Sequence, residues 1–157
     1  MGDLKVYEIP LENITLEKFN VRNKQHMEMI ERFRDPLARE MCYDVRLDVA
    51  LTLSGKVGKN NFLVKNDNEY FGYIQISDDI SGERTLCYIV QEKLRGKGLG
   101  KIMLNSVSDY LLENNLASTL KLCISKSNYV SAKLAMQCGF EKGNYVGGNM
   151  VGYYRKK

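Results

Sequence analysis

The sequence has no tryptophan, only two prolines and a single histidine, His26. Its four cysteines, Cys42, Cys87, Cys123 and Cys138, stand far apart and form no C-x-x-C pair. Zinc sites and disulfide frameworks need cysteine and histidine at short, repeated spacings. We therefore expect no metal site and no disulfide, and we interpret the cysteines as small buried hydrophobic residues in a reducing compartment.

Long apolar runs are also absent. No stretch approaches the roughly 18 apolar residues of a membrane-spanning helix, and the first residues contain no long apolar core. We expect no membrane partner and a cytoplasmic location. The 157 residues, 44% of them hydrophobic, predict a single domain over 1–157.

Charge of one sign is not concentrated in the sequence. The net charge is only +4 over 157 residues, and no stripe of lysine and arginine is interleaved with aromatic residues. A dedicated nucleic-acid-binding protein is usually more basic, so we expect no nucleic-acid partner. A mildly basic chain suits a small polyanionic ligand equally well.

What the sequence does contain is a glycine-rich stretch after an apolar strand. The segment from Leu86 to Val90 predicts a buried strand. It is followed, after four residues, by Arg95-Gly96-Lys97-Gly98-Leu99-Gly100-Lys101. Alternating glycines remove Cβ atoms where a strand turns into a helix, so backbone N–H groups can converge on one anion there. With a local charge of about +3, the stretch predicts a phosphate-binding loop.

The spacing of the glycines excludes two common phosphate-binding loops. The ATP-binding pattern G-x-x-x-x-G-K-[ST] would need glycine at Arg95 and a hydroxyl at Ile102. A dinucleotide pattern G-x-G-x-x-G would need glycine at Lys101 or at Met103. What fits is R-x-x-G-x-G, directly after a buried strand and at the start of an amphipathic helix.

This motif resembles that of the GNAT superfamily of N-acetyltransferases, in which it binds the pyrophosphate of acetyl-coenzyme A. The resemblance extends over about residues 84–140 and includes a second element, N-x-x-A/S-x-x-x-Y-x-x-x-G-F. Asn128, Ser131, Gly139 and Phe140 match it, whereas Ala135 stands where the tyrosine is expected. In many relatives that tyrosine protonates the coenzyme A thiolate, so the resemblance leaves the proton donor, and with it catalytic activity, open.

The resemblance implies a fold and a ligand. The fold is α/β (α+β), with a mixed, mostly antiparallel central sheet of six to seven strands, a splayed parallel pair formed by its fourth and fifth strands, and about four flanking helices. The ligand is acetyl-CoA, a co-substrate that lies in the gap of the splayed pair. The residues expected to bind it are Ile89, Val90, Arg95, Gly96, Lys97, Gly98, Leu99, Gly100, Lys101 and Asn128.

The residues themselves predict the order of the elements. A strand over 86–90, a helix over 101–115 and a strand over 120–124 form a βαβ unit, so the two strands should be parallel neighbours. The patterns also predict hairpins formed by strands 62–64 and 70–76 and by strands 144–146 and 150–154. Earlier in the chain we expect a strand over 4–9, one or two helices over 14–34 and a helix over 35–51. A last helix begins at 127 or 128, carries Val130, Leu134 and Cys138 on one face, and stops at Gly139.

The expected activity is acetyl transfer from acetyl-CoA to a primary amine of a small molecule or a protein, by direct attack in a ternary complex. The alternative is a non-catalytic acyl-CoA-binding or sensor module that kept the loop and lost the tyrosine. No catalytic residue is assigned. Cys138 and Tyr145, nearby in the sequence, are candidate proton donors, and Glu83, Glu92 and the acidic residues of the first helices are unranked candidate bases.

The acceptor amine is not specified by any motif. The resemblance places the helical region after the first strand at the wall of the acceptor site, where Met27, Phe33 and Tyr43 are candidates. The oligomeric state also stays open, with a homodimer through an exposed C-terminal strand as one arrangement.

Overall fold

The computed structural model describes residues 4–36, Ala50 and 59–157. Within these residues the chain forms eight strands, three α-helices and one 3-10 helix. The strands are β1 (Glu8–Pro10), β2 (Thr15–Lys18), β3 (Lys59–Asn66), β4 (Glu69–Ser77), β5 (Glu83–Val90), β6 (Thr119–Ser125), β7 (Glu141–Gly147) and β8 (Met150–Lys156). The helices are α1 (Lys24–Glu31), α4 (Leu99–Glu113) and α5 (Tyr129–Gln137), and the 3-10 helix is η1 (Glu92–Leu94).

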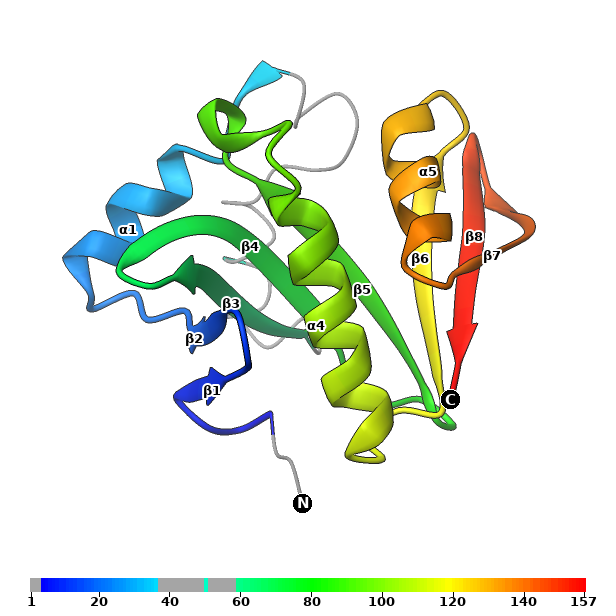
Figure 1. Cartoon of the computed structure of the whole chain (residues 1–157), viewed down its shortest axis with the longest axis horizontal. Coiled ribbons are helices and arrows are strands. Elements are labelled where there is room, and N and C mark those ends of the chain that lie inside the picture. The colour runs from blue at the N-terminus through cyan, green and yellow to red at the C-terminus, as the bar shows by residue number, and fades with distance from the viewer. Residues whose placement is uncertain (1–3, 37–49, 51–58) are drawn as a thin grey trace.

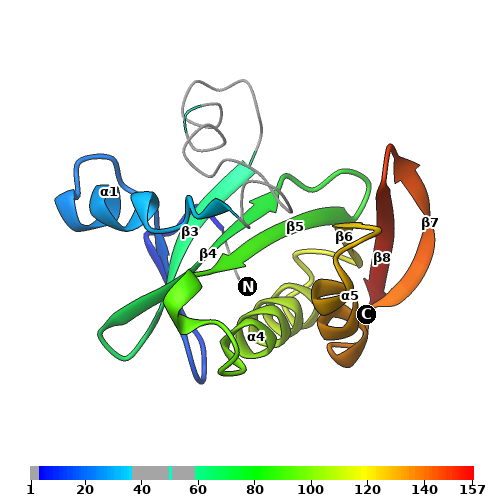
Figure 2. The same ribbon diagram turned by 90° about the horizontal axis from the view of Figure 1, so that it is seen from above.

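All eight strands belong to one sheet, in the order β1-β2-β3-β4-β5-β6-β8-β7 (Figure 1). Figure 2 shows α4 and α5 on one face of this sheet and α1 on the other. Each face has its own core: Met103 and Leu104 belong to the larger cluster, and Phe33 and Tyr73 to the smaller one. None of the described helices is long and apolar enough to cross a membrane.

Two neighbouring strands, β5 and β6, separate part-way along their length. They are the one parallel pair among the described strands, and they pair where Glu83–Leu86 faces Thr119–Leu122. β5 nevertheless continues to Val90 and β6 to Ser125. Figure 1 shows them meeting at one end and diverging toward the start of α4. We refer to the opening beyond this pairing as the fork; the predicted parallel pair and its divergence are confirmed.

The sheet has eight strands where six to seven were predicted, because the segment predicted as helical over 14–34 begins with a strand. Within β2, Leu16 packs into the larger core while its neighbour Glu17 bonds to His26 of α1. Leu16 and Glu17 thus face opposite sides of the sheet and both are buried. The sequence does not reveal this strand, since a charged residue such as Glu17 is normally exposed. The parallel pair is consequently formed by the fifth and sixth strands, not the fourth and fifth. The helix predicted over 35–51 lies almost entirely outside the described residues.

The helix after β6 agrees with prediction in extent but not in its buried face. It begins after Asn128, whose Oδ1 accepts a hydrogen bond from the Ser131 N–H at 3.2 Å, and it ends before Gly139, with φ +84°. Val130, predicted to share an apolar face with Leu134 and Cys138, is 80% exposed, whereas Cys138 is 2% and Ala135 0% exposed. At about 100° per residue, Val130 lies roughly 140° around the helix from Ala135 and so faces away from the core.

Both predicted hairpins are present, and their strands are longer than predicted. The first strand is shorter, at Glu8–Pro10 instead of 4–9. The C-terminal strand is not exposed at an edge as expected, because β8 lies between β6 and β7. The free edge on that side is β7, whose side chains are mostly exposed.

A buried carboxylate joins β2, α1, β3 and β4. Glu17 Oε1 accepts hydrogen bonds from His26 Nε2 at 2.5 Å and from Tyr70 Oη at 2.6 Å, and Oε2 lies 2.9 Å from Lys65 Nζ. His26 Nδ1 accepts the backbone N–H of Asn20, which assigns the proton of the neutral ring to Nε2. Burial alone would raise the pKa of Glu17, but the hydrogen bonds from Tyr70, Lys65 and His26 outweigh it and lower this pKa to about 2.

Replacing this carboxylate (Glu17→Gln) is expected to lower the free energy of unfolding by about 2 to 4 kcal/mol near neutral pH, because the buried donors lose a charged acceptor. Since the folded pKa is depressed from 4.5 to about 2, the stabilisation is fully present above about pH 4.5 and fades as the pH falls toward 2. Urea unfolding across this pH range measures both effects. The exposed Glu12→Gln is the control. Equal losses in the two variants, or a loss undiminished at about pH 2.5, would contradict the assignment.

Candidate functional site

The loop between β5 and α4 has a shape that glycine alone adopts without strain. Gly96 and Gly98 both have φ +79°, in the left-handed region that costs other residues about 1 to 2 kcal/mol. Gly100 is instead short of room, since a Cβ there would lie 3.2 Å from Leu134 Cδ1 and 3.5 Å from Val90 Cγ2. The first two glycines shape the turn, and the third lets α4 approach α5 and β5.

The turn leaves a run of backbone donors open. Gly98 is the N-cap of the 15-residue helix α4 and provides no side-chain cap. Within the described part of the chain, no backbone N–H from Gly96 to Lys101 has a hydrogen-bond acceptor. Open N–H groups at a helix N-terminus, together with the positive end of the helix dipole, bind anions. The exposed side chains of Lys97 and Lys101 add positive charge beside them.

A cleft of about 450 Å³ opens beside this loop, between the end of β5 and the start of α5. Nine of the ten residues predicted to bind acetyl-CoA line it: Ile89, Val90, Arg95, Gly96, Gly98, Leu99, Gly100, Lys101 and Asn128. The tenth, Lys97, is exposed on the loop outside the lining. Across the cleft α5 presents Tyr129 and Val130, which are 78% and 80% exposed. The cleft therefore pairs an anion-binding loop with an apolar wall.

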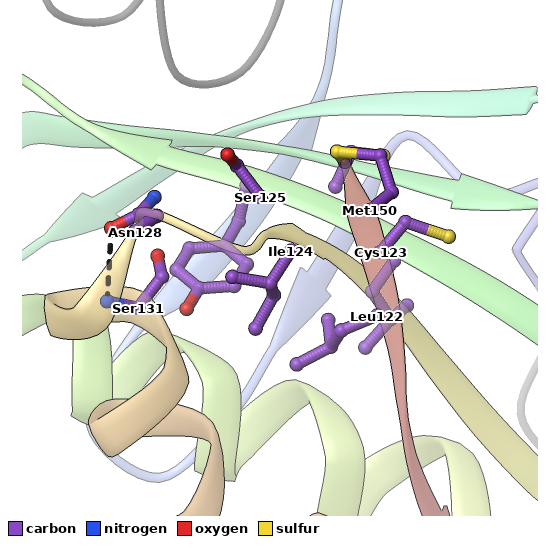
Figure 3. Close-up of a pocket in the computed structure, with 10 residues that line it drawn as sticks. Leu122, Cys123, Ile124, Ser125, Asn128, Ser131 and Met150 are labelled. Atoms are coloured by element: carbon purple, nitrogen blue, oxygen red, sulfur yellow. Dashed lines mark hydrogen bonds between the residues drawn. The ribbon is translucent and has the colours of Figure 1, made fainter. Parts of the chain in front are cut away.

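A second, smaller cavity of about 110 Å³ lies in the fork itself. Figure 3 shows the hydrogen bond between Asn128 and Ser131 at one end of this cavity, and Cys123 and Met150 at the other. Three residues line both cavities: Tyr88, Asn128 and Ser131. These residues mark the junction at which the cleft meets the fork. A ligand bound by its phosphates at the loop can reach the fork through this junction.

The model of the acetyltransferase (GNAT) family matches residues 21–140 of the chain. The chain belongs to this family. The predicted superfamily is thereby confirmed, and with it the class of reaction, acetyl transfer from acetyl-CoA to an amine.

Individual relatives agree with this membership. Acetyltransferase PseH of Campylobacter jejuni subsp. jejuni serotype O:23/36 (strain 81-176) is 27% identical over 135 residues, which cover 81% of this chain and 84% of PseH. The crystal structure of C. jejuni PseH in complex with acetyl coenzyme A has a TM-score of 0.71 at 25% identity, covering 92% of this chain and 99% of that one. Aminoglycoside acetyltransferase AAC(6')-Ib, in complex with coenzyme A and kanamycin, shares the fold with a TM-score of 0.77 at 15% identity, over 92% of this chain and 95% of that one.

In this GNAT chain, the arginine of the loop motif directs its side chain into the protein. Arg95 Nε donates to the Val90 carbonyl at 2.9 Å. Its Nη1 and Nη2 donate to the two carboxylate oxygens of Asp35 at 2.9 and 2.8 Å. The Asp35 side chain is only 5% exposed, so this bidentate pair holds the guanidinium firmly. Arg95 lines the cleft as predicted, but its charge faces Asp35.

The proton donors and bases considered from the sequence do not meet at the junction. Cys138 is 2% exposed, its Sγ donates to the Lys101 carbonyl at 3.8 Å, and burial raises the pKa of its thiol. Tyr145 is exposed on the edge strand β7. Glu83 stands at the closed end of the fork, and Glu92 is exposed in η1. None of these four candidates lines either cavity.

The candidates for the acceptor wall have mixed outcomes. Phe33 is fully buried and packs against Tyr73 with their ring centroids 6.2 Å apart, so it is a core residue. Met27 is 42% exposed on α1, and Tyr43 lies outside the described residues. Tyr88 was not predicted as a site residue. Its one available signal was its place two residues after Leu86, on the strand face that packs against α4.

Breaking the ion pair behind the loop (Asp35→Asn) is expected to weaken acetyl-CoA binding about tenfold, because the loop loses the anchor that fixes its donors. Titration calorimetry with acetyl-CoA measures the dissociation constant directly. Glu31→Gln, which alters the half-exposed Glu31–Arg34 pair nearby, is the matched control and should leave the affinity unchanged. Tighter binding by Asp35→Asn would instead mean that Asp35 masks a charge the phosphates can use.

Proposed function

We propose that the chain transfers an acetyl group from acetyl-CoA to a primary amine of a small molecule or a protein, by direct attack within a ternary complex. The observation that carries this proposal is the run of open backbone N–H groups from Gly96 to Lys101, beside two strands that have separated. Diphosphate is the ligand that such a run recognises, and the fork provides space for the rest of the cofactor.

The cofactor is positioned by main chain more than by charge. The N–H groups from Gly96 to Lys101 hold the diphosphate. The backbone of Ile89 and Val90, at the end of β5, directs the pantetheine arm toward the junction. Asn128 is already the N-cap of α5 through its Oδ1, while its Nδ2 has no acceptor among the described residues and can donate to the cofactor. The complex of the relative PseH with acetyl coenzyme A supports this choice of ligand.

The chemistry then depends on holding two reactants side by side. Fixed N–H donors stabilise negative charge on the thioester oxygen, which is usually the largest electrostatic contribution to acyl transfer. Binding the amine next to the thioester supplies a further large part by proximity. No carboxylate or imidazole of the described residues lines either cavity, so within this part of the chain the proton of the attacking amine is left to water.

The acceptor is best approached with a panel of amines. Structural neighbours below 25% identity include an enzyme bound to kanamycin, a spermidine N-acetyltransferase and a ribosomal L7/L12 alpha-N-protein acetyltransferase. They share the fold and differ in acceptor. Aminoglycosides, polyamines, amino sugars and peptide N-termini together cover this range. Release of coenzyme A thiol with any of them establishes turnover.

The competing function is a non-catalytic acyl-CoA-binding module. It is favoured by Ala135, which replaces the tyrosine that protonates the thiolate in many relatives. Tight binding of acetyl-CoA without thiol release for any amine of the panel would select this reading over the enzyme.

A single methyl group on the loop tests where the cofactor binds. Gly98→Ala places a side chain at φ +79°, so the loop must relax and its N–H groups move. We expect the dissociation constant for acetyl-CoA to rise at least about tenfold, measured by titration calorimetry. The control is Gly148→Ala in the turn between β7 and β8, because Gly148 also has a positive φ, +53°, and open space around its Cα. Equal affinity in the two variants would contradict the assigned site.

A further inference from the structure

Tyr88 projects from the part of β5 that has left β6. The ladder between these strands ends at Leu86, and Tyr88 lies two residues beyond it on the same strand face. Leu86 and Val90, its neighbours on that face, pack with Tyr88 into the core beneath α4 and α5. The tyrosine is half-buried, its hydroxyl oxygen is buried, and it lines both the cofactor cleft and the fork cavity.

The junction contains one side chain that can act as an acid. Of the three residues shared by the cavities, Asn128 has an amide and Ser131 an aliphatic hydroxyl, neither of which gives up a proton in the working pH range. Tyr88 has a phenol, whose O–H can donate and can ionise. Cys87 and Cys123 line the fork but not the cleft.

The replacement of the helix tyrosine by Ala135 fits this placement. Ser131 and Ala135 are four residues apart and so lie one above the other on α5. Ser131 borders the fork together with Tyr88, and Ala135 is 0% exposed in the core that Tyr88 packs against. Tyr88 and Ala135 thus belong to one packed core, the large residue on the strand and the small one on the helix.

We infer that Tyr88 is the proton donor to the leaving coenzyme A thiolate. The inference rests on the proposed function. The amine nitrogen forms a bond to the acetyl carbon, the carbon–sulfur bond breaks, and the thiolate takes the phenolic proton. The proton lost by the attacking amine returns through water to the phenolate. The products are the acetylated amine and neutral coenzyme A, and the enzyme regains its starting state.

The test compares Tyr88→Phe, which removes the hydroxyl and keeps the ring, with Tyr145→Phe, which alters an exposed tyrosine of β7 that lines neither the cleft nor the fork. Thiol release with a turned-over amine gives kcat, and calorimetry gives the acetyl-CoA dissociation constant. For Tyr88→Phe we expect kcat to fall at least about tenfold with the dissociation constant within about twofold of wild type. The wild-type and Tyr145→Phe rates should decline at alkaline pH, because a phenol that has lost its proton cannot donate one. Tyr88→Phe should lack that decline.

Three results would overturn the inference: an unchanged kcat, a loss of kcat matched by an equal loss of acetyl-CoA affinity, or a reduced kcat that keeps the alkaline decline. The first shows that the hydroxyl is not needed, and the other two show a structural role. Wild-type protein that releases no thiol with any amine would instead refute the proposed function, and this inference with it.

Discussion

The end of hydrogen bonding between β5 and β6 is the constraint on which the rest of the site depends. Up to Leu86 and Leu122 the two strands form an ordinary parallel ladder, and beyond it they diverge. The divergence is held by packing on both sides: β5 stays paired with β4 as far as Val90, and β6 stays paired with β8 as far as Ser125. Because each strand keeps one partner, the sheet can open a gap in its middle without losing its order.

The gap between β5 and β6 lies beside the N-terminus of α4, and this position gives that N-terminus a role in binding. An open helix N-terminus is common, but here it faces a cleft that continues into an opened sheet. Backbone N–H groups supply most of the recognition, since Arg95 is neutralised by Asp35 and, in the part of the chain that the structure describes, the loop adds positive charge through exposed lysines. Main-chain donors are fixed by the fold and lose little conformational entropy on binding. The order of the loop therefore depends on its anchor, Asp35, which lies sixty residues earlier in the chain.

The parts of the fold that the sequence predicted are those whose causes are local. The strand before the loop, the positive-φ glycines, the Asn128 cap and the stop at Gly139 each follow from a few adjacent residues. The strand β2 was missed because Glu17 is buried by partners on α1, β3 and β4. The partner of Arg95 was missed for the same reason. Long-range pairs of polar groups leave no periodic pattern in the sequence, so they are found only when the chain is folded.

The position of Tyr88 changes the weight of the strongest argument for an inactive protein. A non-catalytic binding module was favoured because the loss of tyrosine at 135 was taken as the loss of the proton donor. In the inferred role, the phenol of Tyr88 supplies a donor at the junction of cleft and fork, and catalysis requires a donor near the sulfur and not a particular residue number. The small residue at 135 and the large one at 88 pack into the same core. The described residues that line the fork and the cleft include neither a carboxylate nor an imidazole. Whether the chain is an enzyme or a binding module thus depends on whether an amine can lose its proton in the fork.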